Sequence, residues 1–215
     1  GIEAMCSADN MAIGKMGAMK LASAMKEQGE AAVFVHDKES TSGKLREESF
    51  VKEMQEKYPQ MTIPVVYHMD DLEEMAKVIA EERNAEKKEG EEGILAEDIR
   101  QAEAIAYLLE KNPNIKGCFT TNAETTQQLL EVLEETDKED MAVIAVDGGA
   151  EQMKALEDGR VNGLIVQNPY GMGYAAVIAA SRASLGMGNE AFVDTGFIWV
   201  TKENLNDENI AGMLY

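Results

Sequence analysis

Short apolar runs alternate with longer stretches of helical spacing along most of the chain. The apolar runs have the length of buried strands and fall at 2–7, 31–36, 62–67, 115–121, 142–146, 163–167 and 196–200. Helical spacing fills most of the intervening sequence, at 9–29, 41–57, 71–82, 96–110, 124–134, 150–158 and 171–185. Strands that alternate with helices in this way form a parallel sheet with helices packed on its faces. The pattern therefore predicts an α/β protein.

One stretch breaks this alternation. Residues 83–93, RNAEKKEGEEG, are almost wholly polar and include two glycines. Such a segment has no apolar side chains to bury, so we expect an exposed loop between two helices.

Composition narrows the class of partner. The 215 residues include 20 Lys and Arg against 40 Asp and Glu, so the formal net charge is −20. Proteins that bind nucleic acid neutralise phosphate with basic patches, so this charge argues against a nucleic-acid partner. No run approaches the roughly 18 to 20 apolar residues of a membrane span, and the start GIEAMCSADN lacks the layout of a signal peptide. We expect a soluble chain.

Polar side chains stand where three successive predicted strands end. Asn122, Asp147 and Gln167 follow or close these strands, and Arg46 lies on the helix after the second strand. In parallel α/β sheets ligands bind beyond the carboxyl ends of the strands. Planar side chains that donate and accept hydrogen bonds in pairs suit adjacent hydroxyls, such as those of a sugar. These four residues are the candidate ligand-binding residues.

Three of the four also have a purely structural interpretation. Asp147 and Asn122 could cap the helices that follow them. Arg46 could form a surface ion pair with Glu47 or Glu48. Both interpretations stay open at the level of sequence.

Catalytic and metal-binding patterns are missing from the sequence. His36 and His68 end two predicted strands, but neither belongs to a nucleophile motif, and no Cys and His spacing suits a metal. The glycines form neither a dinucleotide-binding fingerprint nor a phosphate loop. We therefore expect a binding protein without catalytic residues, metal or cofactor.

A set of motifs, in one order along the chain, resembles a known family. The motifs are ADN with a glycine-containing helix at 8–22, STSGKLREESF at 40–50, NPNIKGCFTTN at 112–122, VIAVDGG at 143–149, LEDGRVNGLIVQNPYGMGYAA at 156–176 and VTKENL at 200–205. Together they resemble the periplasmic sugar-binding proteins of ABC importers, in particular the ribose-binding type. The resemblance covers nearly the whole chain and is interrupted mainly around 83–95.

The resemblance implies a fold and a site. Family members have two flavodoxin-like lobes, joined by three hinge strands, that trap a ligand between them. The match implies that Arg46, Asn122, Asp147 and Gln167 occupy sugar-contacting positions. It also implies that the chain begins where the family crosses from its first lobe into its second.

The implied organisation has three parts. Residues 1–167 would form the ligand-binding lobe two with the first hinge, 168–200 a returning helix and strand of lobe one, and 201–215 a C-terminal hinge and tail. The fold class is thus a flavodoxin-like three-layer parallel sheet, the C-terminal lobe of a type 1 periplasmic-binding protein, with a remnant of the N-terminal lobe. Such a remnant would expose apolar surface, so we expect self-association.

The function implied is capture of a small sugar or related polyhydroxylated solute for a membrane ABC permease. The full-length protein would be periplasmic or extracellular, with a lipid anchor as one form of attachment. Two other binding modules share the fold and stay open: the effector-binding domain of a lactose-repressor-type transcription regulator and the sensor domain of a signalling receptor.

Overall fold

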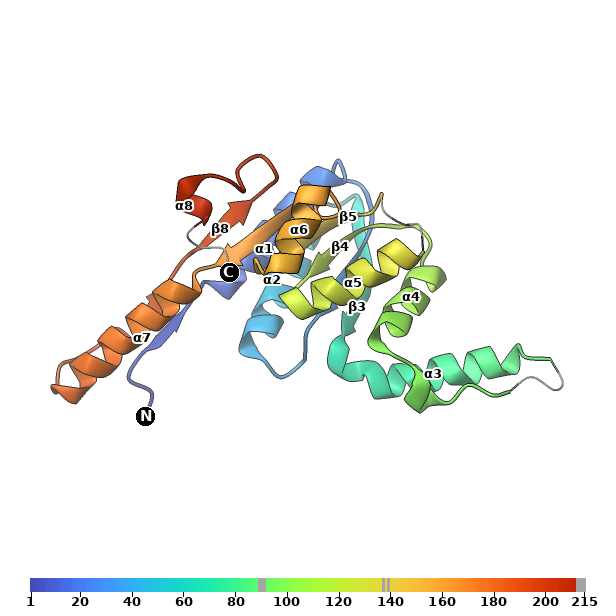
Figure 1. The fold of residues 1–215 in the computed structure, drawn as a ribbon, viewed down its shortest axis with the longest axis horizontal. Helices are drawn as coiled ribbons and strands as arrows, with labels where there is room; N and C mark the ends of the chain where they lie inside the picture. Colours follow the sequence, from blue (N-terminus) through green and yellow to red (C-terminus); the bar gives the residue numbers. More distant parts are fainter. Residues whose placement is uncertain (89–91, 137, 139, 212–215) are drawn as a thin grey trace.

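A computed structural model describes residues 1–88, 92–136, 138 and 140–211. Its centre is a six-stranded sheet in the order β3-β2-β4-β5-β6-β8 (Figure 1). The strands are β2 (Gly29–Val35), β3 (Met61–His68), β4 (Ile115–Thr120), β5 (Ala142–Val146), β6 (Gly163–Gln167) and β8 (Phe197–Val200). All neighbours are parallel except β6 and β8, which pair antiparallel. The predicted α/β class is confirmed.

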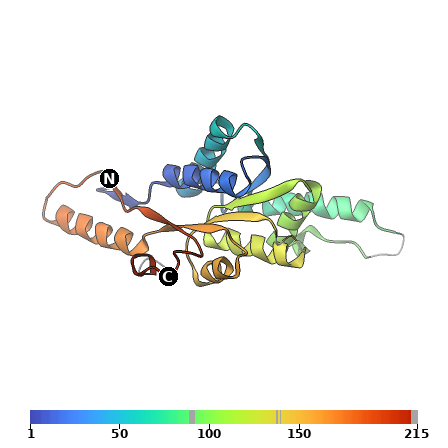
Figure 2. The same cartoon turned by 90° about the horizontal axis from the view of Figure 1, so that it is seen from above.

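Helices cover both faces of this sheet and make three layers (Figure 2). One face carries α1 (Asn10–Ala24) and α2 (Thr41–Lys57). The other face carries α3 (Leu72–Ala85), α4 (Gln101–Lys111), α5 (Ala123–Glu135) and α6 (Ala150–Asp158). Two short 3-10 helices, Met69–Asp71 and Ala96–Asp98, precede α3 and α4.

Strand β2 shows how the sequence divides the core between the two faces. Its residues from Ala31 to Val35 are all buried. Ala31, Val33 and Val35 pack with α1 and α2, whereas Ala32 and Phe34 pack in the cluster under α3 to α6. Successive side chains of a strand point to opposite faces, so a continuous apolar run is what a strand covered on both sides requires.

Helices α1 and α2 approach each other closely because α1 carries glycine at the contact. A Cβ atom at Gly14 would lie 2.2 Å from the backbone oxygen of Arg46. One turn further, a Cβ at Gly17 would lie 2.5 Å from the ring of Phe119. That ring stacks on Phe50 of α2, with centroids 4.5 Å apart. The two glycines therefore set the position of α2 over the sheet.

A smaller unit extends away from the six-stranded sheet. It consists of the parallel pair β1 (Met5–Ser7) and β7 (Phe192–Asp194) with helix α7 (Pro169–Ser184), and it lies at the left of Figure 1. Strand β7 was not predicted. The strand expected to return with this unit, 196–200, is instead β8, which lengthens the main sheet beside β6. The boundary at residue 200 therefore does not separate the two units, because the chain re-enters the larger one at Phe197.

The helix boundaries depart most from the sequence pattern at the end of α1, which stops at Ala24 instead of 29, and at the start of α4, which begins at Gln101 instead of 96. A smaller departure falls in the polar segment 83–93. Helix α3 continues into this segment as far as Ala85. Asn84, in the last turn of α3, contacts Ile94 through two hydrogen bonds: Nδ2 donates to the Ile94 oxygen, and the Ile94 nitrogen donates to Oδ1, each at 2.8 Å. Residues 89–91 lie outside the described part. The last helix is α8 (Glu208–Ala211).

The close approach of α1 and α2 gives a testable consequence. Replacing Gly14→Ala places a methyl group against the Arg46 backbone, and overpacking of this kind costs about 1–3 kcal/mol. Thermal unfolding followed by circular dichroism should show a midpoint lowered by several degrees.

A second glycine offers the control. Gly173→Ala in α7 meets no atom within 4 Å, and alanine favours a helix over glycine by about 0.5–1 kcal/mol. This variant should be at least as stable as the wild type. Equal destabilisation by both changes would contradict the packing argument.

Candidate ligand-binding site

The carboxyl ends of the parallel strands meet at one edge of the sheet. The strand order reverses between β2 and β4, because β3 lies on one side of β2 and β4 on the other. Loops diverge at such a point and leave room beyond the strand ends, which is where open α/β sheets bind their ligands. The four candidate residues are found at or beside this edge.

Arg46 is held inside the protein by the elements around it. Its side chain is only 4% exposed. Nε donates to Oδ1 of Asn10 at 2.9 Å, and Nη1 donates to the backbone oxygen of Thr121 at 2.6 Å. The surface ion pair that its neighbours Glu47 and Glu48 suggested is therefore wrong. The guanidinium instead ties α1, α2 and the end of β4 together.

Asn122 and Asp147 meet at the start of α5. Asn122 caps this helix, since its Oδ1 accepts from the Thr125 nitrogen at 2.9 Å. Asp147 does not cap the helix that follows it, whose N-cap is Gly149. Its Oδ2 instead accepts from the Ala123 nitrogen at 3.1 Å. The carboxylate thus lies at the positive end of α5, where a negative charge is stabilised.

Gln167 completes the group from the next strand. Its Nε2 donates to Oδ1 of Asp147 at 2.7 Å. Asp147 has a backbone φ of 83°, a left-handed conformation that aspartate tolerates better than most residues. The structure therefore brings Arg46, Asn122, Asp147 and Gln167 into one continuous run along the sheet edge.

The arrangement leaves hydrogen-bonding capacity on its solvent side. Asn122, Asp147 and Gln167 are each half-buried. A carboxylate has about four acceptor positions, and the two protein donors that contact Asp147 take one on each oxygen. Gln167 keeps a second N–H and an amide oxygen. Neighbouring hydroxyl groups of one ligand could engage these positions together.

Sequence reasoning missed three residues that support this edge. Asn10 orients Arg46, and Thr121 accepts from it through its backbone oxygen. Thr121 Oγ1 also accepts from the His36 nitrogen at 3.0 Å. His36 was noted only as a strand end. The sequence signal for these residues is their position. Asn10 stands at the start of a buried helix, and Thr121 and His36 stand at the ends of buried strands.

His36 connects two elements beside the site. Its Nδ1 lies 2.7 Å from Thr121 Oγ1, and its Nε2 lies 2.7 Å from Oγ of Ser40, which caps α2. Burial lowers the pKa of His36 below its ordinary value, against the nearby Asp37 carboxylate, which raises it. The imidazole therefore favours the neutral form in the folded protein.

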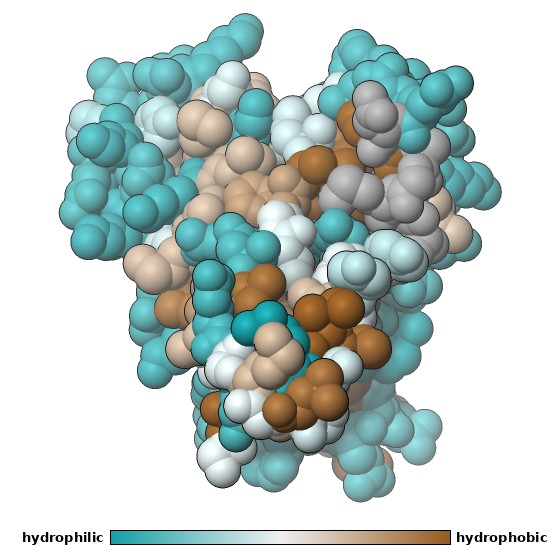
Figure 3. Space-filling model, turned by 90° about the vertical axis from the view of Figure 1, so that its left-hand side faces the viewer, coloured by the Kyte–Doolittle hydropathy of each residue, from teal (hydrophilic) through white to brown (hydrophobic). Residues whose placement is uncertain are grey.

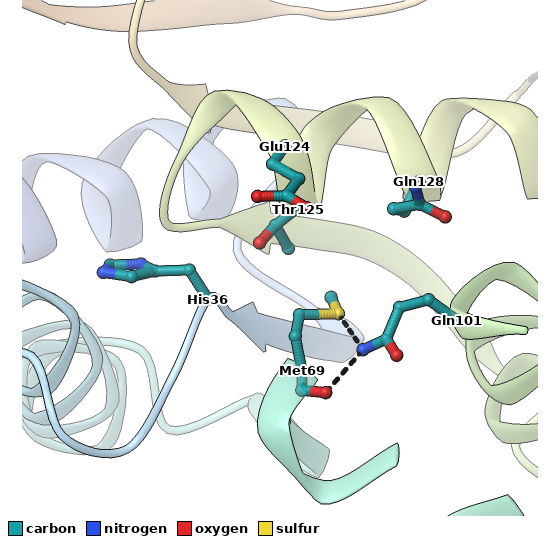
Figure 4. A pocket seen from close by; sticks show the side chains of 6 residues that line it. All are labelled: His36, Met69, Gln101, Glu124, Thr125 and Gln128. Carbon is teal, nitrogen blue, oxygen red and sulfur yellow. Dashed lines mark hydrogen bonds between the residues drawn. The ribbon is translucent and has the colours of Figure 1, made fainter.

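A pocket of about 210 Å³ opens next to this histidine (Figure 4). His36, Met69 and Gln101 line it from below the start of α5, and Glu124, Thr125 and Gln128 line it from α5 itself.

Within the described ranges no group of three or more His, Cys, Asp or Glu side chains is placed to hold a metal ion. Nor does any helix of the described part have the length and apolar character to cross a membrane.

A parallel sheet with polar planar side chains at its switch point is the architecture of a protein that binds small molecules. Residues 4–187 match the model of the periplasmic binding protein domain, and the chain belongs to that family. Its fold is the type 1 periplasmic-binding fold. None of the curated proteins is similar enough to the chain to count as a match.

Solved structures of carbohydrate-binding proteins share this fold. The chain resembles a carbohydrate transporter solute-binding protein from Agrobacterium radiobacter in complex with D-arabinose, with 25% identity and a TM-score of 0.80 over 100% of this chain and 66% of the other. An Agrobacterium vitis ABC transporter solute-binding protein with bound D-fucose has 21% identity and a TM-score of 0.81, over 99% of this chain and 65% of the other. GanP, a glucose-galactose binding protein from Geobacillus stearothermophilus, has 20% identity and a TM-score of 0.77, over 95% of this chain and 64% of the other. The chain thus spans slightly less than two thirds of these proteins.

The lowered pKa of His36 predicts a pH-dependent contribution to stability. As pH falls through about 6.5, the unfolded chain binds a proton on this histidine before the folded protein does, so the free energy of unfolding decreases. Replacing His36→Gln removes this contribution. Urea unfolding between pH 7.5 and 5 should therefore show a smaller pH-dependent decrease for the variant than for the wild type. Parallel curves for the two proteins would contradict the assignment.

Proposed function

We propose that this protein binds a small sugar or a related polyhydroxylated solute at the carboxyl edge of its sheet. The observation that carries the proposal is the position of Asp147, with one protein donor on each carboxylate oxygen and free acceptor positions toward solvent. The family membership and the carbohydrate-binding neighbours support it. The role proposed is binding, without making or breaking a bond.

The residues of the edge have distinct proposed roles. Asp147 accepts from two sugar hydroxyls, Gln167 and Asn122 donate and accept at neighbouring hydroxyls, and Arg46 contributes positive charge from below the edge. Sugar hydroxyls lose their water contacts on binding, so each must be replaced by a protein hydrogen bond. Charged acceptors form the stronger of these bonds.

Enclosing the ligand would need a second lobe that covers the carboxyl edge of the sheet. We propose that residues 8–167 with β8 form one lobe, and that β1, α7 and β7 belong to a second lobe. The solved relatives are about half as long again as this chain. We propose that the rest of the second lobe lies in the part of their length that this chain does not span. A ligand that contacts both lobes stabilises the closed arrangement through its differential contacts.

The cellular role follows from the same family. We propose that the protein delivers its solute to the membrane permease of an ABC importer, in the periplasm or outside the cell, with a lipid anchor as its attachment to the membrane. The ABC transporter proteins among the structural neighbours support this role. The acidic composition suits a protein surrounded by solvent.

The second unit also favours self-association of this chain. Helix α7 exposes apolar and aromatic side chains, with Tyr170 at 80%, Val177 at 68% and Leu185 beyond its end at 73% exposure. Hydrophobic atoms gather on this end of the molecule in Figure 3. Exposed apolar surface of this extent marks an interaction site, and a second copy would present the same surface.

The sugar proposal is tested by replacing Asp147→Asn. Calorimetric titration with millimolar D-arabinose, D-fucose, D-tagatose and D-allose should detect weak binding of at least one sugar by the wild type. The variant loses a charged acceptor whose bonds are worth about 1.5–3 kcal/mol, so its affinity should fall about tenfold or more.

A matched change of charge away from the site is the control. Asp98→Asn removes an exposed carboxylate from the 3-10 helix before α4 and should bind as the wild type does. Unaltered affinity in Asp147→Asn would refute the proposed role of this edge.

Self-association is tested by sedimentation velocity over a range of protein concentrations. The wild type should sediment faster as concentration rises, and Val177→Lys should remain monomeric because a charge then lies in the apolar surface. Gln127→Lys, at an exposed position of α5, is the control and should behave as the wild type. A wild type that stays monomeric throughout would disprove the prediction.

A further inference from the structure

The pocket beside His36 is separate from the run of four residues but adjoins it. Its lining side chains come from the ends of β2 and β3 and from the first turns of α4 and α5. Thr125, one of these residues, donates its backbone N–H to Asn122 Oδ1. His36, another, contacts Thr121, the residue just before Asn122. The pocket is therefore a lateral extension of the proposed sugar site on the side of β2.

A buried hydroxyl without a partner points into this pocket. Thr125 is 1% exposed, and among the residues that the structure describes its Oγ1 meets no hydrogen-bonding group. Figure 4 shows this oxygen directed from α5 into the space between His36 and Met69. Nearly all buried polar side-chain atoms in proteins have a partner, so one that lacks it calls for an explanation. A hydroxyl of a bound ligand would supply the missing bond.

The other lining groups recognise the same chemistry. The side chain of Gln101 is oriented by the 3-10 helix before α3, because its Nε2 donates to the Met69 backbone oxygen at 2.9 Å. Gln128 lies one turn along α5 from Glu124, on the side of Gln101 (Figure 4). Two amides and a hydroxyl match the hydroxyls of a polyol, and the thioether of Met69 offers an apolar contact for C–H groups. The Glu124 carboxylate disfavours a negatively charged ligand.

The volume of the pocket limits what it can hold. About 210 Å³ is less than the roughly 300–1,000 Å³ of a pocket that encloses a whole drug-sized ligand. The pocket therefore suits one further unit of a ligand whose first unit lies at Asp147.

We propose that this pocket is a second subsite, which accepts an additional uncharged, hydroxyl-bearing unit joined to the sugar bound at Asp147. The preferred solute of the protein is then a neutral disaccharide or glycoside rather than a single sugar. This inference rests on the proposed sugar-binding function and adds the size and charge of the solute to it. It is carried by the adjacency of the pocket to Asn122 and by the unpartnered hydroxyl of Thr125.

The test compares affinities for single sugars and disaccharides. Titrations of the isotope-labelled chain, followed by NMR, use D-glucose and D-galactose against cellobiose and lactose. At least one disaccharide should bind tenfold or more tightly than its component sugars. In Thr125→Val, which keeps the shape of the side chain without the hydroxyl, and in Gln128→Ala, the ratio of disaccharide to single-sugar affinity should fall at least threefold.

The adjacent residue provides the control. Gln127 is exposed on the same helix and lines a different groove, so Gln127→Ala should keep the wild-type ratio. Single sugars that bind as tightly as disaccharides, or a ratio that survives both subsite variants, would overturn the second subsite and leave the sugar site intact. If neither size of sugar binds, the proposed function fails, and the subsite fails with it.

Discussion

The buried guanidinium of Arg46 is the interaction on which the site depends. It reaches Asn10 at the start of α1 and the backbone of Thr121 at the end of β4, so one side chain fixes two helices and a strand. A buried charge is costly unless it is fully hydrogen-bonded, and bonds to a charged group contribute about 1.5–3 kcal/mol each. Because Arg46 must reach both partners, few packing arrangements of α1 against α2 are possible. Gly14 allows the observed arrangement, because the side chain of any larger residue would clash with the Arg46 backbone.

Hydrogen bonds fix the side chains along the sheet edge next to Arg46. Asn122 is fixed by capping α5, Asp147 by the first backbone N–H of that helix, and Gln167 by Asp147. Each side chain is thus oriented before any ligand arrives, which reduces the ordering cost of binding. The same groups remain half-buried, so they keep unused donors and acceptors toward solvent. A rigid polar edge of this kind suits a ligand with several hydroxyls more than one with a single charged group.

The sequence predicted the class of fold and most strands because β2, β4, β5 and β6 are continuous apolar runs that must be covered on both faces. It did not predict β7, since Phe192–Asp194 is a short, mostly exposed strand that pairs with β1 in the described part of the chain. Nor did it assign β8 to the main sheet, because pairing with β6 is a contact between distant segments. The positions of Asp147 and Gln167 followed from strand ends. The burial of Arg46 did not follow, because Glu47 and Glu48 beside it suggested an exposed helix face.

The proposed site at Asp147 is tested by a map of backbone and side-chain amide shifts on addition of a neutral sugar. We expect the largest shifts at Ala123, Gly148 and the side-chain amide of Gln167, which surround Asp147. Shifts concentrated elsewhere, such as the groove between α1 and α2 around Lys15, would contradict it.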